Sequence, residues 1–388
     1  MSFDNIDFET NPNFKFKEYP AELRECLGST YVYDVFKSKE GKTILISPYW
    51  NINKQCNTEG DPSKDLEQYH YISLIDLQDN KEIKKLVKHK DRVITCRFFE
   101  NPFNKKQYFI SADRKCQVVV WDLSDDCKII FDENVRYDNF IYSVLMFFDE
   151  NKIYVVTSTL GNGETLIYTV GDKAEPTKIE YTKDTSVYYL DYWNEKKDDG
   201  KLYHYIIQLV KNSVIIHSFT EGKEIQRFDT GEKYANNLCG MVYKKNGKDL
   251  LITSATRGLI QVIDLESKKL LWSKEYNDVF FYNFVKWNEN IILLYDAFQR
   301  RIFVLDTNTE GNQAYKIISK VLCPEMFYDK FIKKVNHPVY GESLLSIGVD
   351  WRIKLWVNRN VVVDDMIIIV LGLLNVLEEG IYIYFILC

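Results

Sequence analysis

The sequence predicts an all-β fold built from seven consecutive repeats. Strand-forming aromatic residues are abundant, with 27 Tyr and 23 Phe among 388 residues, whereas Gly and Pro number only 17 and 8. A marker residue within a short apolar segment also recurs at intervals of 46, 47, 49, 46, 42 and 51 residues. The seven markers are Ile75, Trp121, Tyr168, His217, Ile263, Leu305 and Trp356. This regularity favours one large repeat fold over two or three separate domains.

Each repeat contains four short strand-like runs joined by turns rich in Asn, Asp, Lys and Gly. Third runs, which hold the marker, include 72–76, 118–122, 260–264, 302–306 and 353–356. Second runs are 43–47, 108–111, 153–157, 205–209, 250–253, 291–294 and 343–346. First runs include 93–98, 142–147, 187–192 and 281–286. Half-polar fourth runs include 82–87, 128–131, 224–228 and 269–272. The pattern predicts four short strands for every repeat.

Two segments, 86–122 and 344–356, resemble WD repeats. Both end in Trp, a Ser stands ten residues before each Trp, and the first carries the Trp-Asp dipeptide that names the family. An Asp stands six residues before the second Trp, and a His lies upstream in the first segment. The residues that carry the resemblance are His89, Ser111, Trp121, Asp122, Ser346, Asp350 and Trp356. We interpret them as structural residues of the blades, because buried polar groups need partners.

The resemblance covers residues 29–357 and implies a seven-bladed β-propeller of four-stranded antiparallel blades. In such repeats a Trp, a Ser, a His and an Asp form a buried hydrogen-bonded set. Asp113 stands two residues early relative to Trp121, no Gly-His pair is present, and the third, fourth and sixth repeats lack the Asp and the Trp. At most the second blade is therefore expected to hold a full set.

We expect three regions: an N-terminal segment at 1–28, the propeller at 29–360 and an apolar tail at 361–388. A ring needs a last outer strand, because closure removes exposed edges. Residues 14–19 are favoured for this strand over 361–363, since they share the half-polar character of other fourth runs. The tail lacks Lys and Arg, and two glutamates interrupt its apolar run. It is interpreted as packed strands or a helix, as a tail anchor, or as non-native sequence.

Charge and cysteine usage restrict the class of protein. The net charge is −6, which argues against a general nucleic-acid binder. Eight Cys are present without a Cys-x-x-Cys pair, and no apolar signal segment follows Met1. We therefore expect reduced thiols and a cytoplasmic location.

No motif for catalysis or for cofactor binding is present. Gly161, Asn162 and Gly163 resemble the start of a dinucleotide-binding loop, but they stand between two strands and predict a tight turn. His204 and His217 lie on neighbouring predicted strands without a third ligand nearby. We therefore expect that the protein is not an enzyme and that it binds no metal ion and no cofactor.

The resemblance implies that loops between second and third strands open onto the narrower, top face of the propeller. Basic and aromatic residues in those loops form the candidate partner-binding set: Arg114, Lys115, Lys211, Arg257, Arg300, Arg301, Trp351 and Arg352. We expect a non-catalytic scaffold, a subunit of a larger assembly, that binds an acidic or phosphorylated protein motif there. Two alternatives stay open: these are ordinary polar turns, or the acidic loop 49–68 covers this face. The competing function is a membrane-associated propeller, attached through the tail or through anionic lipid.

Overall fold

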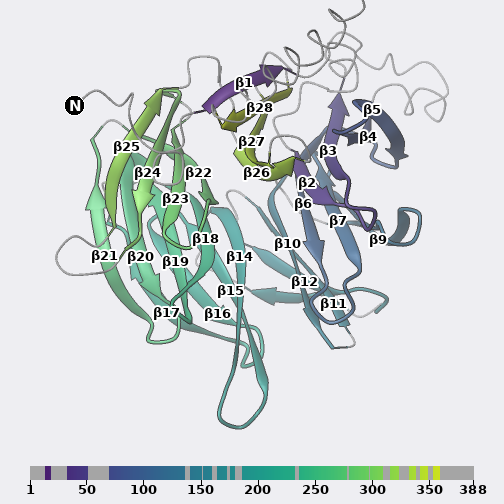
Figure 1. Ribbon diagram of the computed structural model, residues 1–388. Coiled ribbons are helices and arrows are strands. Elements are labelled where there is room, and N and C mark those ends of the chain that lie inside the picture. The colour runs from purple at the N-terminus through teal and green to yellow at the C-terminus, as the bar shows by residue number, and fades with distance from the viewer. Residues whose placement is uncertain are drawn as a thin grey trace, which may run out of the picture.

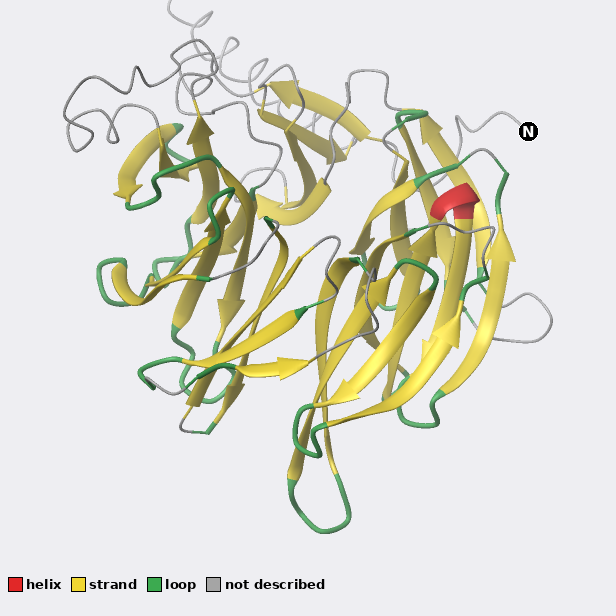
Figure 2. Ribbon diagram, turned by 180° about the vertical axis from the view of Figure 1, so that it is seen from behind, coloured by secondary structure: helices red, strands yellow, loops and turns green. Residues whose placement is uncertain are grey.

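The protein forms seven four-stranded antiparallel sheets arranged as blades around a common axis (Figure 1). The computed structural model describes residues 14–18, 33–50, 70–135, 140–150, 152–159, 164–172, 175–179, 186–231, 236–277, 279–296, 298–308, 315–322, 332–337, 341–347 and 353–358. Across those ranges the only helical turn is the 3-10 turn η3 (Thr256–Gly258), drawn in red in Figure 2. The predicted fold class, a seven-bladed β-propeller, is confirmed.

Within blades 1 to 6 the strands follow chain order from the axis outward. The inner strands are β2 (Asp34–Lys37), β6 (Val93–Glu100), β10 (Ile141–Asp149), β14 (Val187–Lys196), β18 (Asn237–Lys245), β22 (Phe281–Lys286) and β26 (Ile332–His337). The second strands are β3 (Thr43–Trp50), β7 (Gln107–Asp113), β11 (Lys152–Thr159), β15 (Leu202–Val210), β19 (Lys248–Ala255), β23 (Ile291–Asp296) and β27 (Gly341–Ile347). Inner strands of neighbouring blades contact one another, so they surround the axis.

The remaining strands form the outer half of each blade. The third strands are β4 (His70–Asp76), β8 (Gln117–Asp122), β12 (Thr165–Thr169), β16 (Ser213–Ser218), β20 (Leu259–Asp264), β24 (Arg301–Asp306) and β28 (Ile353–Asn358). The outer strands are β5 (Lys81–Val87), β9 (Lys128–Asn134), β13 (Thr177–Ile179), β17 (Lys223–Asp229), β21 (Lys269–Glu275), β25 (Lys316–Leu322) and β1 (Phe14–Glu18). In blade 3 the outer strand is only three residues long.

The core is divided among the blade interfaces. Seven clusters of buried apolar side chains each bridge two neighbouring blades of the described chain, including the pair formed by blades 7 and 1. Strand β8 shows the cause, because alternate side chains of a strand point to opposite faces of its sheet. Val118 and Val120 pack toward blade 3, whereas Val119 and Trp121 pack toward blade 1. Burial on both faces explains why the third strands read as continuous apolar runs.

The two ends of the described chain meet in blade 7. Strand β1 pairs antiparallel with β28, from Phe14 opposite Asn358 to Glu18 opposite Lys354. Figure 1 shows β1, in purple, beside the olive β28. The N-terminal segment favoured from the sequence thus supplies the outer strand of blade 7. The competing segment 361–363 lies outside the described residues, as does the rest of the tail.

Candidate functional site

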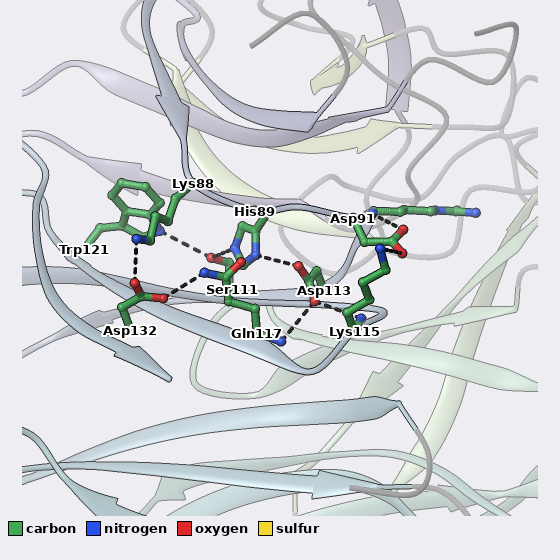
Figure 3. A network of polar contacts seen from close by, with 10 residues as sticks. Lys88, His89, Asp91, Ser111, Asp113, Lys115, Gln117, Trp121 and Asp132 are labelled. Carbon is green, nitrogen blue, oxygen red and sulfur yellow. Dashed lines mark hydrogen bonds and ion pairs between the residues drawn. The ribbon is translucent and has the colours of Figure 1, made fainter. Parts of the chain in front are cut away.

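Blade 2 contains a buried set of four polar side chains (Figure 3). The Ser111 hydroxyl lies 2.7 Å from Nε2 of His89 and 3.3 Å from Nε1 of Trp121. Nδ1 of His89 lies 3.4 Å from Oδ2 of Asp113. Each of these four side chains is at most 3% exposed. One order of donors satisfies all of them: the indole N–H donates to Ser111, the Ser111 hydroxyl donates to His89, and Nδ1–H donates to Asp113.

The polar set continues beyond Asp113. The other oxygen of that carboxylate accepts the backbone N–H groups of Lys115, at 2.9 Å, and Gln117, at 3.0 Å. The Gln117 amide in turn donates to Asp132 at 2.8 Å, and Lys88 pairs with the same carboxylate at 2.6 Å. Asp113 thus completes the buried set of blade 2 and links it to the backbone of the turn that follows β7. These contacts bind strands β7, β8 and β9 together.

Two further residues with the predicted structural role are found in blade 7. Nε1 of Trp356 donates to Oγ of Ser346 at 2.8 Å, which reproduces the Trp–Ser half of the blade 2 set. Asp350 lies outside the described residues, as do Trp351 and Arg352.

Asp122 ends β8 and Asp113 ends the antiparallel strand β7, so the two aspartates lie at opposite ends of the blade. Its Oδ1 accepts the backbone N–H of Ser124 at 2.9 Å, and Lys106 approaches its Oδ2 to 3.4 Å. Blades 1 and 5 repeat this arrangement, with Lys42 at 2.6 Å from Asp76 and Lys248 at 3.9 Å from Asp264. In blades 1, 2 and 5, a lysine at the start of the second strand is therefore paired with an aspartate at the end of the third strand. We call this the bottom face of the ring.

The predicted basic residues lie at the other face, which we call the top face. Arg114 and Lys115 follow β7, Lys211 follows β15, and Arg257 lies within η3. All four are exposed. Lys115 stands 3.9 Å from Asp91. In the described part of the chain, no carboxylate forms an ion pair with Arg114, Lys211 or Arg257. The remaining two residues of the predicted set, Arg300 and Arg301, are partly buried at the start of β24.

A tight turn holds Arg257 at the top of blade 5. Its backbone is left-handed, with φ of 63°, and the next residue, Gly258, has φ of 72°. A Cβ atom on Gly258 would lie 2.0 Å from the carbonyl oxygen of Tyr276, so only glycine fits there. This turn fixes the direction in which the chain presents Arg257, which matters because a charged anchor is most effective when it is pre-positioned.

Charged side chains from two non-adjacent blades meet within the ring. Arg97 of β6 donates to the carbonyl oxygen of Leu190 at 2.9 Å and pairs with Asp191 of β14 at 3.1 Å. The other oxygen of Asp191 accepts the backbone N–H of Val242 at 3.0 Å. Arg97 and Asp191 are therefore neutralised by each other, and they connect blades 2, 4 and 5 rather than forming an open site.

No group of three His, Cys, Asp or Glu side chains suited to a metal ion occurs among the described residues. A pocket of about 270 Å³ lies between blades 3 and 4, but its charged side chains are already engaged. Lys178 pairs with Glu164 at 2.7 Å, and Lys223 pairs with Glu221 at 3.0 Å. His217 lines this pocket, whereas His204 lies beside the Tyr192 hydroxyl at 2.7 Å. The lysines and the glutamate that line this pocket are therefore already held in ion pairs.

We expect the free energy of unfolding to fall as the pH drops below about 6.5, which is the ordinary pKa of a histidine side chain. Burial lowers the pKa of His70, His204 and His217, so the unfolded chain binds protons there more readily than the folded chain does. The stabilisation is thus present above that value and lost below it. Thermal denaturation at pH 7.5 and 5.5 measures the effect, and a His204→Gln, His217→Gln variant should flatten it. If the melting temperature fell equally between pH 7.5 and 5.5 in the wild-type chain and the variant, these histidines would not be the cause.

No protein-family model matches the sequence of this chain, and no curated protein matches it either. Among the described residues, no helix is long enough and apolar enough to cross a membrane. The fold is that of a β-propeller, an architecture that commonly serves as a protein-interaction scaffold and is usually non-enzymatic.

Proposed function

We propose that this protein is a non-catalytic, cytoplasmic scaffold of the WD-repeat type. It binds a partner protein through acidic or phosphorylated residues on its top face, as one subunit of a larger assembly. The propeller in this proposal comprises residues 29–360 together with the outer strand β1 (Phe14–Glu18) from the N-terminal segment, and 361–388 are a separate tail. The blade 2 set of His89, Ser111, Trp121 and Asp113 supports the WD-repeat assignment. Among the described residues, Cys96, Cys116, Cys127 and Cys239 are not joined in disulfides, which agrees with the proposed reducing compartment.

The observation that carries this proposal is a difference between the two faces. On the bottom face of blades 1, 2 and 5, Lys42, Lys106 and Lys248 are each paired with a strand-end aspartate. On the top face, Arg114, Lys211 and Arg257 are exposed and make no ion pair with any carboxylate of the described chain. Basic side chains that are not neutralised within the molecule can attract an anionic partner.

The chemistry of these side chains selects the class of ligand. A guanidinium group presents a planar fork of N–H donors that matches the oxygens of a carboxylate or a phosphate. Lys211 and Arg257 stand two residues before the third strands of blades 4 and 5, which are neighbours in the ring. They occupy corresponding places in adjacent blades, so one acidic segment that follows the rim can meet both.

Reversing two of these charges should remove the partner. We expect a Lys211→Glu, Arg257→Glu variant to recover its partners at least about 10-fold less well, because hydrogen bonds to charged groups contribute roughly 1.5–3 kcal/mol each. Quantitative affinity purification of the tagged full chain with mass spectrometry measures the loss. A Lys152→Glu, Lys201→Glu variant is the matched control, since it makes the same charge change in bottom-face hairpins. Equal loss in both variants, or none in either, would refute the top-face site.

A further inference from the structure

The inner strands of five consecutive blades share a β-bulge at the same place. Each pairs with its second strand through a register shift near its first residue, in blades 2 to 6. The shifts lie between Val93 and Thr95, Ile141 and Ser143, Val187 and Tyr189, Asn237 and Cys239, and Phe281 and Asn283. The residues passed over are Ile94, Tyr142, Tyr188, Leu238 and Tyr282. All five are apolar or aromatic, and a bulge redirects the side chain that it carries.

These bulges lie at the top end of the channel. The inner strand of blade 3 begins opposite the end of its second strand, with Ile141 paired to Thr159, and the loop to the third strand follows there. The bulges of blades 2, 4, 5 and 6 have the same relation to their top-face loops. By contrast, β2 and β26 of blades 1 and 7 pair without any register shift in their described residues. The bulge residues thus follow one arc of the mouth.

Aromatic side chains along this arc form two groups of contacting rings, one on blades 3 and 4 and one on blade 6. The rings of Tyr142 and Tyr188 lie 6.1 Å apart, edge to face, and the Tyr188 hydroxyl donates to Oδ1 of Asn236 at 2.6 Å. On blade 6, the Phe298 ring lies 6.0 Å from Tyr282 and 5.2 Å from Phe280. We call Tyr142, Tyr188, Tyr282, Phe280 and Phe298 the aromatic collar.

Two members of the collar are exposed and three are partly buried. Tyr142 is 45% exposed and Phe298 is 61% exposed, whereas Tyr188, Phe280 and Tyr282 are partly buried. Exposed aromatic side chains gathered at one place mark an interaction site more often than isolated ones do. Aromatic residues supply much of the binding energy at protein interfaces, because they bury a large area with few rotatable bonds.

We propose that the collar receives one large apolar side chain of the partner, and that acidic residues flank this anchor in the partner's sequence. This rests on the proposed top-face function and specifies the motif that it recognises. The exposed Lys211 and Arg257 stand in the loops of blades 4 and 5, the same arc as Tyr188 and Leu238. Their charges oppose a cationic ligand, and the aromatic surface gives a purely polar anion no apolar contact. A peptide that combines an apolar anchor with carboxylates complements both.

Selection from a random heptapeptide library displayed on phage, with the full chain immobilised, tests the motif. We expect enriched peptides to place Phe, Tyr, Trp, Leu or Ile at one position with Asp or Glu on either side. Enrichment of acidic peptides without an apolar position would overturn the collar proposal and leave the top-face function standing. Enrichment of basic peptides, or no enrichment, would overturn both.

Two variants then locate the contact. We expect Tyr142→Ala combined with Phe298→Ala to weaken binding of the enriched peptide by roughly 10- to 30-fold, as truncation of interface hot spots does. Both side chains are exposed, so the fold should persist. Phe103→Ala is the matched control, because Phe103 is 47% exposed in the hairpin between β6 and β7 on the opposite face. Fluorescence anisotropy gives the dissociation constants. Equal affinity for the collar variant and the wild-type chain would place the anchor elsewhere.

Discussion

A Trp121→Ala variant is expected to lose about 3–5 kcal/mol of unfolding free energy, as removal of a large core aromatic usually does. The indole is 3% exposed and packs between blades 1 and 2 among Ile72, Phe109 and Val119. Its loss opens a cavity at an interface on which closure of the ring depends. It also removes the N–H that reaches Ser111, so the change acts on the packing and on the polar set together.

Denaturant titration of matched variants separates these contributions. Trp121→Phe keeps most of the ring and loses the N–H, and it should cost about 1–3 kcal/mol, the range for a buried polar group left without its partner. Trp272→Ala is the control, because Trp272 lies on the outer strand β21 and is only partly buried. If Trp121→Ala proved as mild as Trp272→Ala, the blade 1–2 interface would not depend on Trp121.

The fold could be predicted because each blade is buried on both faces. Because both faces are buried, the third strand of each blade is a short apolar run. Because the blades are similar in size, these runs are evenly spaced along the chain. Blades 3, 4 and 6 have Tyr168, His217 and Leu305 at the marker position, yet they form four-stranded sheets like the others. The apolar period therefore indicates the architecture even where the marker residue is not Trp.

The length of one turn explains why Asp113 stood out of place in the sequence. Only residues 114–116 separate β7 from β8. Asp113 is the last residue of β7, and from there its carboxylate reaches both His89 and the backbone of Gln117. Counting back from Trp121 could not show this, because the position depends on the turn rather than on the strand.

The aromatic collar could not have been found from one strand at a time. A bulge is a property of the pairing between two strands, and the segments around Tyr142, Tyr188 and Tyr282 read simply as the starts of apolar strands. The placement of Lys211 and Arg257 in exposed turns followed from the strand pattern alone. The sequence therefore shows which turns carry charged residues. The direction of a side chain at a bulge is known only when the pairing register of the two strands is known.

Deleting residues 1–18 is expected to destabilise the ring by about 3–5 kcal/mol, at roughly 1 kcal/mol for each hydrogen bond lost between strands. The deletion removes β1, which pairs with β28 over five residues, from Phe14 to Glu18. It leaves β28 as an unpaired edge, which also favours association between copies of the chain.

The effect should be local before it is global. Amide hydrogen exchange in Ile353–Asn358 should accelerate in the deletion variant, whereas exchange in β15 and β16 of blade 4 should change little, because local opening reports the nearest lost contacts. Deletion of residues 1–10 is the matched control, since it leaves β1 in place. A melting temperature and β28 exchange rate equal to those of this control would show that the ring is held without β1. In that case the blade 7–1 cluster around Leu45, Ile75 and Leu345 would have to hold the ring closed.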